Sequence, residues 1–178
     1  MSTVVAWDRD QLALGLDGLL DVYAEAMVVD PAAASGRRPI VTAHLDRDGL
    51  RAVAAHEQGE LVGVAYGYLG RPGQWWHDQV LAAMGEDAAR DWLDGAFEVC
   101  ELHVRPGHQG RGLGAALLTD LLDGTDAPTA VLSTPDEETR ARGFYRARGW
   151  TDLVRRLHFP GDPRAFAVLG LRLQGRAL

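Results

Sequence analysis

Lysine is absent from this sequence, and all 18 of its lysine-or-arginine positions are arginine. A Walker-type phosphate loop needs a lysine that reaches the phosphates, so this kind of nucleotide site is excluded. Phosphate groups must instead be bound by backbone amides and arginine. The net charge of −7, without any basic segment, also argues against a nucleic-acid partner, because binding to phosphates needs a positive field.

Cysteine occurs once, at Cys100, which excludes a framework of intramolecular disulfides and fits a reducing compartment. The histidines show neither zinc-finger spacing nor an H-E-x-x-H helix, so we expect no metal. No apolar run approaches the roughly 18 residues of a membrane span, and the N-terminal residues lack a signal-like pattern. These absences predict a cytoplasmic protein that has no membrane partner.

The chain has the size and composition of a single domain, expected to span residues 1–178. Its hydrophobic content is 47%, and charges of both signs are spread along it, which allows a full core without disulfides or metals. No internal repeat or linker divides it. The oligomeric state is left open, with a homodimer as one alternative.

Helical and strand-like patterns follow one another as in an α/β protein. Leucines at three-to-four spacing predict an amphipathic helix over 11–27 that opens the domain. Two strand-like runs flank Gln58 and Gly59, which predicts a hairpin. The breaker-rich segment 31–39 is expected to be a loop. The other expected elements are helices over 40–50, 113–122 and 137–148 and strands over 97–104, 129–133, 150–159 and 166–173.

A glycine-rich turn joins the strand at 97–104 to the helix at 113–122. Its glycines let the backbone approach a phosphate closely, and the unpaired amides and dipole of the helix start favour negative charge. Arg111 can add a charge-assisted contact. The turn is therefore a candidate pyrophosphate site. The competing interpretation is an ordinary tight turn whose glycines serve only its geometry.

A dinucleotide-binding unit is a second alternative, because Gly110, Gly112 and Ala115 also fit its relaxed fingerprint. That fingerprint normally follows the first strand of a doubly wound domain. Here a pair of helices, a hairpin and a further segment come first, and only a pair of helices follows. The context therefore argues against this alternative.

The run Gln109-Gly110-Arg111-Gly112-Leu113-Gly114 resembles the Q/R-x-x-G-x-G/A motif of the GNAT superfamily of N-acetyltransferases. The preceding ELHVRP is similar to that family's fourth strand, and Gly143-Phe144-Tyr145 with Arg148-Gly149-Trp150 is similar to its closing helix. The resemblance covers roughly residues 50–173. It implies an α/β (α+β) fold with a mixed central sheet of about six to seven strands, about four flanking helices and a splay after the fourth strand. The segment at about 70–95 would be an insertion between the third and fourth strands.

The resemblance also implies that acetyl-coenzyme A is the cosubstrate. Backbone groups of the fourth strand would pair with its pantetheine arm, amides of the turn would hold its pyrophosphate, and an aromatic ring would pack near it. Many members carry an Asn shortly after the fifth strand that contacts pantetheine, and this chain departs from them with Ser133-Thr134-Pro135-Asp136-Glu137. The cofactor-binding residues so implied are Leu102, His103, Val104, Gln109, Gly110, Arg111, Gly112, Leu113, Gly114, Ala115 and Phe144.

Transfer of an acetyl group from a thioester to an amine needs a base for the amine, an oxyanion donor and a proton for the thiolate. An alkylamine has a pKa of about 10, so a base or a water chain has to remove its proton near pH 7. Glu98 and Glu101 are the candidate bases, and they lie on opposite faces of a regular strand because their separation is odd. The amides of Leu102 or Val104 are candidate oxyanion donors.

Tyr145 is expected, from its position in the family, to be the general acid, with a purely structural aromatic as the alternative. Trp75, Trp76 and His77 are expected to line the acceptor pocket, or else to form a packed surface loop. The resemblance thus implies an N-acetyltransferase that moves the acetyl group directly to a primary amine of a small molecule or a protein N-terminus. A catalytically silent acyl-coenzyme A sensor of the same fold is the alternative.

Overall fold

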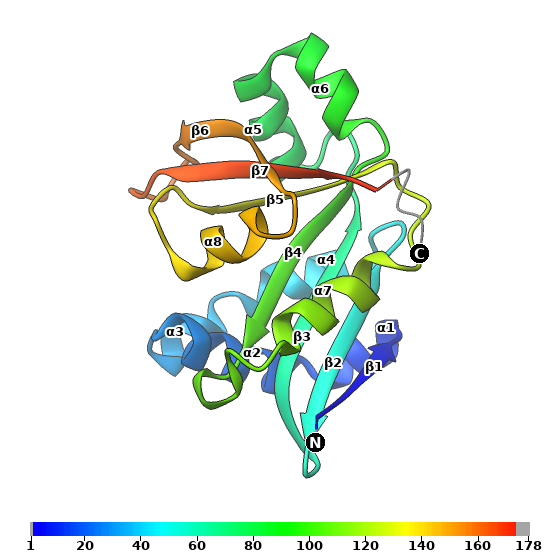
Figure 1. The fold of residues 1–178 in the computed structure, drawn as a ribbon, viewed down its shortest axis with the longest axis vertical. Coiled ribbons are helices and arrows are strands. Elements are labelled where there is room, and N and C mark those ends of the chain that lie inside the picture. The colour runs from blue at the N-terminus through cyan, green and yellow to red at the C-terminus, as the bar shows by residue number, and fades with distance from the viewer. Residues whose placement is uncertain (1, 174–178) are drawn as a thin grey trace. The chain divides into compact units, whose positions relative to one another are not determined.

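The computed structural model describes residues 2–173 of the chain. Within them, strands β1 to β7 form one mixed sheet with the order β1-β2-β3-β4-β5-β7-β6 (Figure 1). The pairs β1–β2, β2–β3, β5–β7 and β6–β7 are antiparallel, and β4–β5 is parallel. This seven-stranded mixed sheet confirms the predicted α/β class.

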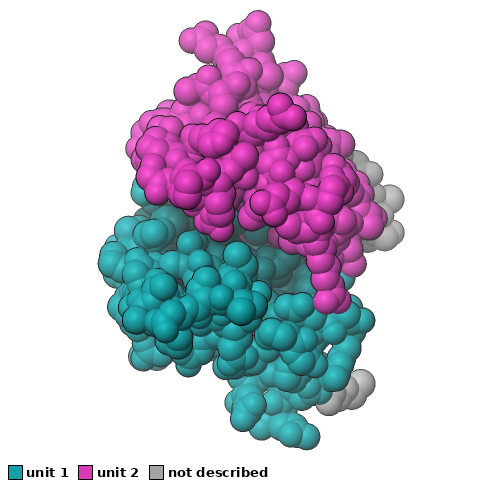
Figure 2. Space-filling view, turned by 90° about the vertical axis from the view of Figure 1, so that its left-hand side faces the viewer, with its two compact units in different colours: residues 1–68, 99–125 teal, residues 69–98, 126–178 magenta. Residues whose placement is uncertain are grey.

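The chain divides into two compact units, which Figure 2 distinguishes by colour. Unit 1 comprises residues 2–68 and 99–125, and unit 2 comprises residues 69–98 and 126–173. Each unit therefore takes two separate stretches of the chain. The first residues of strand β4 (Phe97–Val104) belong to unit 2, and its residues from Val99 onward belong to unit 1. That the whole chain acts as one domain stays a prediction.

Unit 1 contains the predicted hairpin, made by β2 and β3. Gln58 and Gly59 between these strands both have positive φ, 53° and 86°, as a tight two-residue turn in an antiparallel hairpin requires. The elements that contribute to this unit are β1 (Thr3–Trp7), α1 (Arg9–Leu14), α2 (Leu16–Met27), α3 (Pro31–Ser35), α4 (Arg38–His44), β2 (Arg51–Glu57), β3 (Glu60–Leu69), β4, a 3₁₀ turn (Pro106–His108) and α7 (Leu113–Leu122).

The beginning of unit 1 differs from the prediction. A strand, β1, precedes the first helix, and the helix predicted over 11–27 is divided at Gly15 into α1 and α2. A Cβ at Gly15 would lie 2.5 Å from the ring of Trp7, so the division coincides with close packing of β1 on the helices. The expected loop at 31–39 contains α3, which begins at a proline and is capped by Asp30, and α4 ends at His44 rather than near Leu50.

The core of unit 1 lies between its N-terminal helices and the sheet. Leucines of α1 and α2, which the helical spacing places on one face, pack on β2 and β3 together with one residue of α4. The buried members are Leu12, Leu16, Leu19, Leu20, Val22, Val41, Leu45, Ala52, Val64 and Tyr66.

Unit 2 holds the remaining strands and the predicted insertion. Helices α5 (Trp75–Met84) and α6 (Glu86–Leu93) lie between β3 and β4 in the chain, at the predicted place. The other elements are β5 (Thr129–Pro135), α8 (Arg140–Arg146), β6 (Thr151–Leu157) and β7 (Phe166–Arg172). Eight α-helices, several of them short, thus occur in residues 2–173, where about four were expected. None of the described helices is long and apolar enough to cross a membrane.

The core of unit 2 joins the insertion to the strands that follow it. Side chains of α5 and α6 pack with residues of β5, β7 and the β6–β7 connection. The buried members are Val80, Ala89, Leu93, Ala96, Val131, Phe159 and Val168.

Candidate functional site

The glycine-rich turn in unit 1 is shaped by left-handed backbone at Gly110 and Gly112, whose φ angles are 78° and 83°. Gly112 is also the N-cap residue of α7, and no side chain caps this helix, so its first amides have no acceptor within the helix. A Cβ built on Gly112 would meet no heavy atom within 4 Å. The turn therefore presents backbone donors beside open space, an arrangement that suits a phosphate group.

Two residues at the β4 end of the turn hold it in place. The Gln109 side-chain amide donates to the Val104 carbonyl at 2.9 Å, which ties the turn to the end of β4. Arg105 donates from its backbone to Val62 (2.9 Å) and from its side chain to Leu61 (2.8 Å), which ties the same end to β3. The side chain of Gln109 thus has a structural contact, and Arg111 is exposed.

The segment Leu102–Val104, predicted to pair with pantetheine, lies at a close contact within unit 1. A Cβ at Gly63 of β3 would come within 2.9 Å of a Leu117 methyl group on α7 and within 3.2 Å of the His103 carbonyl. Only glycine at this position lets β3, β4 and α7 approach so closely. The later part of β4 and the start of the turn are therefore fixed by backbone packing.

Glu101 belongs to a group of four contacting side chains in unit 1, the others being Arg37, His103 and Tyr23. Its carboxylate is buried and accepts from the Arg37 guanidinium, at 2.9 Å from Nε and by a shorter contact from Nη2. It also accepts from Nε2 of His103 at 2.5 Å. Arg37 stacks over the ring of Tyr23 at 4.7 Å, and His103 meets the same ring edge-on at 5.1 Å. The structure thus brings two predicted site residues, Glu101 and His103, into contact.

These partners decide the protonation state of Glu101. Burial raises the pKa of its carboxyl, but the hydrogen bond and charge of His103 and the charge and hydrogen bond of Arg37 together outweigh burial, so the pKa lies below its usual value. A carboxylate with a lowered pKa is a weak base. Glu101 is therefore poorly suited to remove a proton from an amine, and its charge is already compensated by Arg37.

Two neighbouring residues of β4, Cys100 and Glu101, have partners near α4 in unit 1. Cys100 packs against the core that contains Val41 of α4, and the next residue, Glu101, binds Arg37 at the N-cap of the same helix. Successive residues of a regular strand point to opposite faces. That Glu98 and Glu101 lie on opposite faces of β4 stays a prediction.

Glu98 belongs to unit 2, where it is 5% exposed. It lies opposite Val131 in the parallel ladder of β4 and β5, beside the pair Phe97 and Ala130. This position at the start of β4 keeps its side chain largely away from water.

Tyr145 lies at the C-terminal end of α8, where two backbone bonds end the helix. Trp150 donates from its amide to the Tyr145 carbonyl (3.2 Å), and Gly149 donates to the Arg146 carbonyl (3.1 Å). With Gly149 at φ 84°, these bonds form a Schellman motif, and the rings of Tyr145 and Trp150 meet at 5.4 Å as its hydrophobic contact. The predicted glycine stop is thus confirmed, and it fixes the backbone of Tyr145, whose side chain is buried.

Phe144, the predicted cofactor neighbour on the same helix, is half-buried. The Arg148 guanidinium lies 3.9 Å from the centre of its ring and donates to its carbonyl at 2.9 Å. One edge of the Phe144 ring meets Tyr145 at 5.1 Å. The structure therefore places these two predicted residues side by side.

Residues Trp75, Trp76 and His77 begin α5, and their surroundings differ. Trp76 donates from its indole nitrogen to the Ser133 hydroxyl at 3.1 Å and packs on the core of unit 2. His77 is buried and contacts Asp78 at 3.2 Å. Trp75 is 56% exposed, and its ring lies 5.4 Å from that of Phe159 at a tilt of 37°. Trp76 and His77 thus have structural contacts, and Trp75 is the one of the three that faces solvent.

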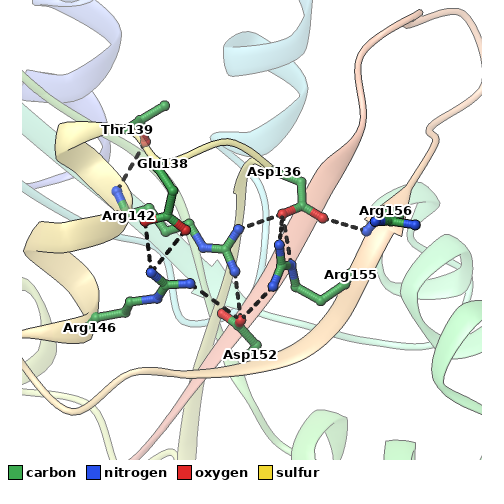
Figure 3. Close-up of polar contacts among 8 residues, drawn as sticks. All are labelled: Asp136, Glu138, Thr139, Arg142, Arg146, Asp152, Arg155 and Arg156. Atoms are coloured by element: carbon green, nitrogen blue, oxygen red, sulfur yellow. Dashed lines mark hydrogen bonds and ion pairs between the residues drawn. The ribbon is translucent and has the colours of Figure 1, made fainter.

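A group of ion pairs surrounds Arg142 of α8 (Figure 3). The sequence patterns do not reveal it. One member, Asp136, follows β5, where many GNAT members carry an Asn. Arg142 is fully buried and donates to Asp136 at 2.5 Å and to Asp152 at 2.6 Å. Asp136 also accepts from Arg155 (2.7 Å) and from the Arg156 amide (2.7 Å). Its carboxylate is thus bound by side chains and backbone of the chain itself.

Known proteins resemble this chain in both sequence and fold. The sequence profile of the Acetyltransferase (GNAT) family matches residues 17–150. The GCN5-like protein acetyltransferase Rv2170 of Mycobacterium tuberculosis is 40% identical, over 89% of this chain and 91% of its own length. This chain therefore belongs to the GNAT acetyltransferase family, whose members are acyl-coenzyme A-dependent transferases.

Two solved structures share the fold at low sequence identity. A GNAT-family protein from Desulfovibrio desulfuricans has a TM-score of 0.68 and 20% identity, with 97% of this chain and 99% of that chain covered. The Salmonella typhimurium protein yncA, solved with its cofactor acetyl-CoA, has a TM-score of 0.61 and 19% identity, with 100% and 97% covered. At such identities these similarities establish the fold alone.

Proposed function

We propose that this protein transfers the acetyl group of acetyl-coenzyme A directly to a primary amine, and that this amine belongs to a protein. The observation that carries the choice of acceptor is the M. tuberculosis relative, which is named as a protein acetyltransferase and is 40% identical to this chain over nearly its whole length. Small-molecule amines, which the sequence also allows as acceptors, are the competing hypothesis. A cytoplasmic location and a homodimer stay predictions.

The coenzyme is proposed to bind along β4 and the turn that follows it. The amides of Gly110 to Ala115 would hold the pyrophosphate, a role supported by the left-handed glycines and the open space at Gly112. Backbone groups of Leu102 to Val104 would pair with pantetheine, and Phe144 would pack near it. Arg111 is exposed and supplies the positive charge nearest in sequence to these amides. The side chain of Gln109 would act indirectly, by fixing the turn to Val104.

The chemistry is proposed to use Glu98, rather than Glu101, as the base. The lowered pKa of Glu101 and its contacts with Arg37 and His103 make it the weaker candidate. Tyr145 would give a proton to the departing thiolate, and the amide of Leu102 or Val104 would stabilise the oxyanion. Trp75, exposed at the start of α5, is the proposed contact for the acceptor.

Release of coenzyme A thiol in the presence of four acceptors tests this function. One is a peptide with a free N-terminus and no lysine, and a second is a peptide with a blocked N-terminus and one lysine. Spermidine and an aminoglycoside are the small-molecule acceptors. Because the enzyme contains no lysine, any acetyl-lysine found by mass spectrometry must come from the added peptide. The same lysine peptide, acetylated beforehand on its side chain, is the matched control.

We expect thiol release with at least one of the two peptides that carry a free amine. The lysine peptide acetylated beforehand, which has no free amine, should give none. Turnover of spermidine or the aminoglycoside alone would overturn the protein acceptor and leave the transferase. Stoichiometric binding of acetyl-coenzyme A without thiol release from any acceptor would favour the sensor instead.

A further inference from the structure

Helix α8, which carries Tyr145, is too short to be stable by its own backbone bonds. It has 7 residues, whereas isolated helices shorter than about 12–15 residues are marginal in water. Its N-terminal end is capped by the Thr139 hydroxyl, which accepts from the Arg142 amide at 3.2 Å. The orientation of this helix therefore depends on contacts that its side chains make with the rest of unit 2.

The strongest of these contacts is made by the Arg142 side chain. Its guanidinium bridges Asp136, which follows β5, and Asp152 on β6 (Figure 3). No part of the Arg142 side chain is exposed. The Asp136 side chain is 1% exposed. Burial raises the pKa of Asp136, but hydrogen bonds from the Arg156 amide and from the Arg155 and Arg142 side chains outweigh it, so the pKa is lowered and the pair stays charged. A planar guanidinium held between two carboxylates fixes direction as well as distance.

Asp136 also joins the helix to the strands around it. Its amide donates to the Ala165 carbonyl just before β7 (2.9 Å), and its carboxylate accepts from the Arg156 amide, where the backbone of β6 has a φ of 55°. Positive φ is unfavourable for a residue other than glycine, so this bond supports β6 at a strained residue. Asp136 is therefore a common anchor for β6, for the start of β7 and, through Arg142, for α8.

Tyr145 lies one helical turn beyond Arg142 on α8. Its carbonyl is fixed by the Schellman motif at the other end of the helix. Arg142 and the Schellman motif at Gly149 thus fix α8 on both sides of Tyr145. A shift of α8 at Arg142 would displace the ring of Tyr145 with it.

We propose that Arg142, held by Asp136 and Asp152, is a positioning residue that aims the hydroxyl of Tyr145 at the leaving thiolate. This inference rests on the proposed function, in which Tyr145 donates that proton. The surface arginine Arg146, on the same helix, is the control. Its side chain is 41% exposed, its partner Glu138 is 76% exposed, and it lies 3.8 Å from Asp152, compared with 2.6 Å for Arg142. Ion pairs at such a surface contribute little.

A double-mutant cycle on kcat tests the proposal, with the best peptide acceptor of the four-acceptor assay. The variants are Arg142→Lys, Tyr145→Phe and both together, with Arg146→Lys as the matched control. Arg142→Lys keeps the positive charge but loses the fork that bridges both carboxylates. Misplacement of a catalytic group by about 1 Å can cost about 100-fold, so we expect Arg142→Lys to lower kcat by roughly 10- to 100-fold with the KM for acetyl-coenzyme A unchanged.

The diagnostic result is the effect of Arg142→Lys when Tyr145 is already Phe. If Arg142 acts through Tyr145, the second change should lower kcat by less than about twofold, because the proton donor is gone in either case. A loss of the same size in both backgrounds would overturn the proposal and leave the transferase intact. Full activity of Tyr145→Phe would overturn it as well.

Amide hydrogen exchange tests the same proposal without turnover, should no acceptor be found. In Arg142→Lys, amides of residues 140–150 should exchange faster than in the wild type, while those of α7 and β2 should not change. Arg146→Lys should leave all of these rates unaltered. Unchanged exchange at residues 140–150 in Arg142→Lys would show that the bridge does not hold α8. Asp136→Asn, which removes the shared carboxylate, provides a second variant should Arg142→Lys fail to fold.

Discussion

Replacement of Gly112 by alanine should have two effects that can be measured apart. One is a loss of stability from backbone strain, and the other is a loss of affinity for the coenzyme. Its φ of 83° is unfavourable for any residue that carries a Cβ, but the Cβ itself would meet no heavy atom within 4 Å. Gly59, in the β2–β3 turn, is a matched control, because its φ is 86° and the space around its Cβ is equally open. The two variants Gly112→Ala and Gly59→Ala should therefore carry similar strain.

The expected loss of stability is the same for both variants. A left-handed conformation costs an L-residue about 1–2 kcal/mol, which corresponds to a decrease in Tm of roughly 2–8 °C for a domain of this size. Thermal unfolding followed by circular dichroism measures this decrease without coenzyme. A much larger decrease for Gly112→Ala would indicate that the turn itself had rearranged.

The affinity for acetyl-coenzyme A should separate the two variants. At Gly112 the new methyl group would occupy the space proposed for the pyrophosphate and would cost at least one charge-assisted hydrogen bond, about 1.5–3 kcal/mol. Calorimetry should then show a Kd raised by roughly 10- to 150-fold in Gly112→Ala and unchanged in Gly59→Ala. Equal affinities in the two variants would refute the assignment of the turn to the pyrophosphate.

Three further predictions follow from the proposed chemistry and from the charges of unit 2. Where the chemical step limits the rate, Tyr145→Phe should lower kcat by about 100-fold, because the donated proton is lost. The Kd for acetyl-coenzyme A, measured by calorimetry, should not change. Glu98→Gln should lower turnover most at low pH and recover partly as the pH rises, and a flat pH–rate ratio would move the base elsewhere. Hydrogen bonds from the Arg164 side chain and amide lower the pKa of Asp162 from 3.8 to about 2. This lowered pKa stabilises the fold above pH ~4, and urea unfolding should show that part lost as the pH falls towards 2, but not in Asp162→Asn.

The parts of the fold that sequence patterns predicted well are those in which neighbouring residues determine the structure. The turn residues Gln58 and Gly59 and the helix 113–122 were predicted at their observed positions, because turn chemistry and helical spacing are local signals. β1 was missed because this short strand at the edge of the sheet is mostly exposed and shows no hydrophobic alternation. The segment of α3 predicts a loop because proline breaks helices in their interior, whereas here it is the first residue of a helix.

The side-chain partners of the candidate site could not be predicted in the same way. Arg37 and Glu101 are 64 positions apart, and their ion pair exists only because the fold brings α4 and β4 together. Nothing in the sequence distinguishes Arg142, a buried arginine, from the exposed Arg146 on the same helix. Sequence patterns therefore located the candidate residues, but the charge state of Glu101 and the anchoring of α8 depended on tertiary contacts.

The division of each unit between two stretches of the chain sets the order in which the protein can fold as it leaves the ribosome. The residues of unit 1 are all present once Thr125 has emerged, and local contacts can form then. Helices α5 and α6 have to wait for β5 and β7, whose residues share a core cluster with Val80 and Leu93, and these strands lie within the roughly 50 residues that have still to emerge. At usual rates of synthesis this takes about 2–10 s, during which the apolar faces of both helices lack their partners. We therefore expect residues 75–93 of the nascent chain to be open to aggregation and to chaperone binding in the interval before β7 is complete.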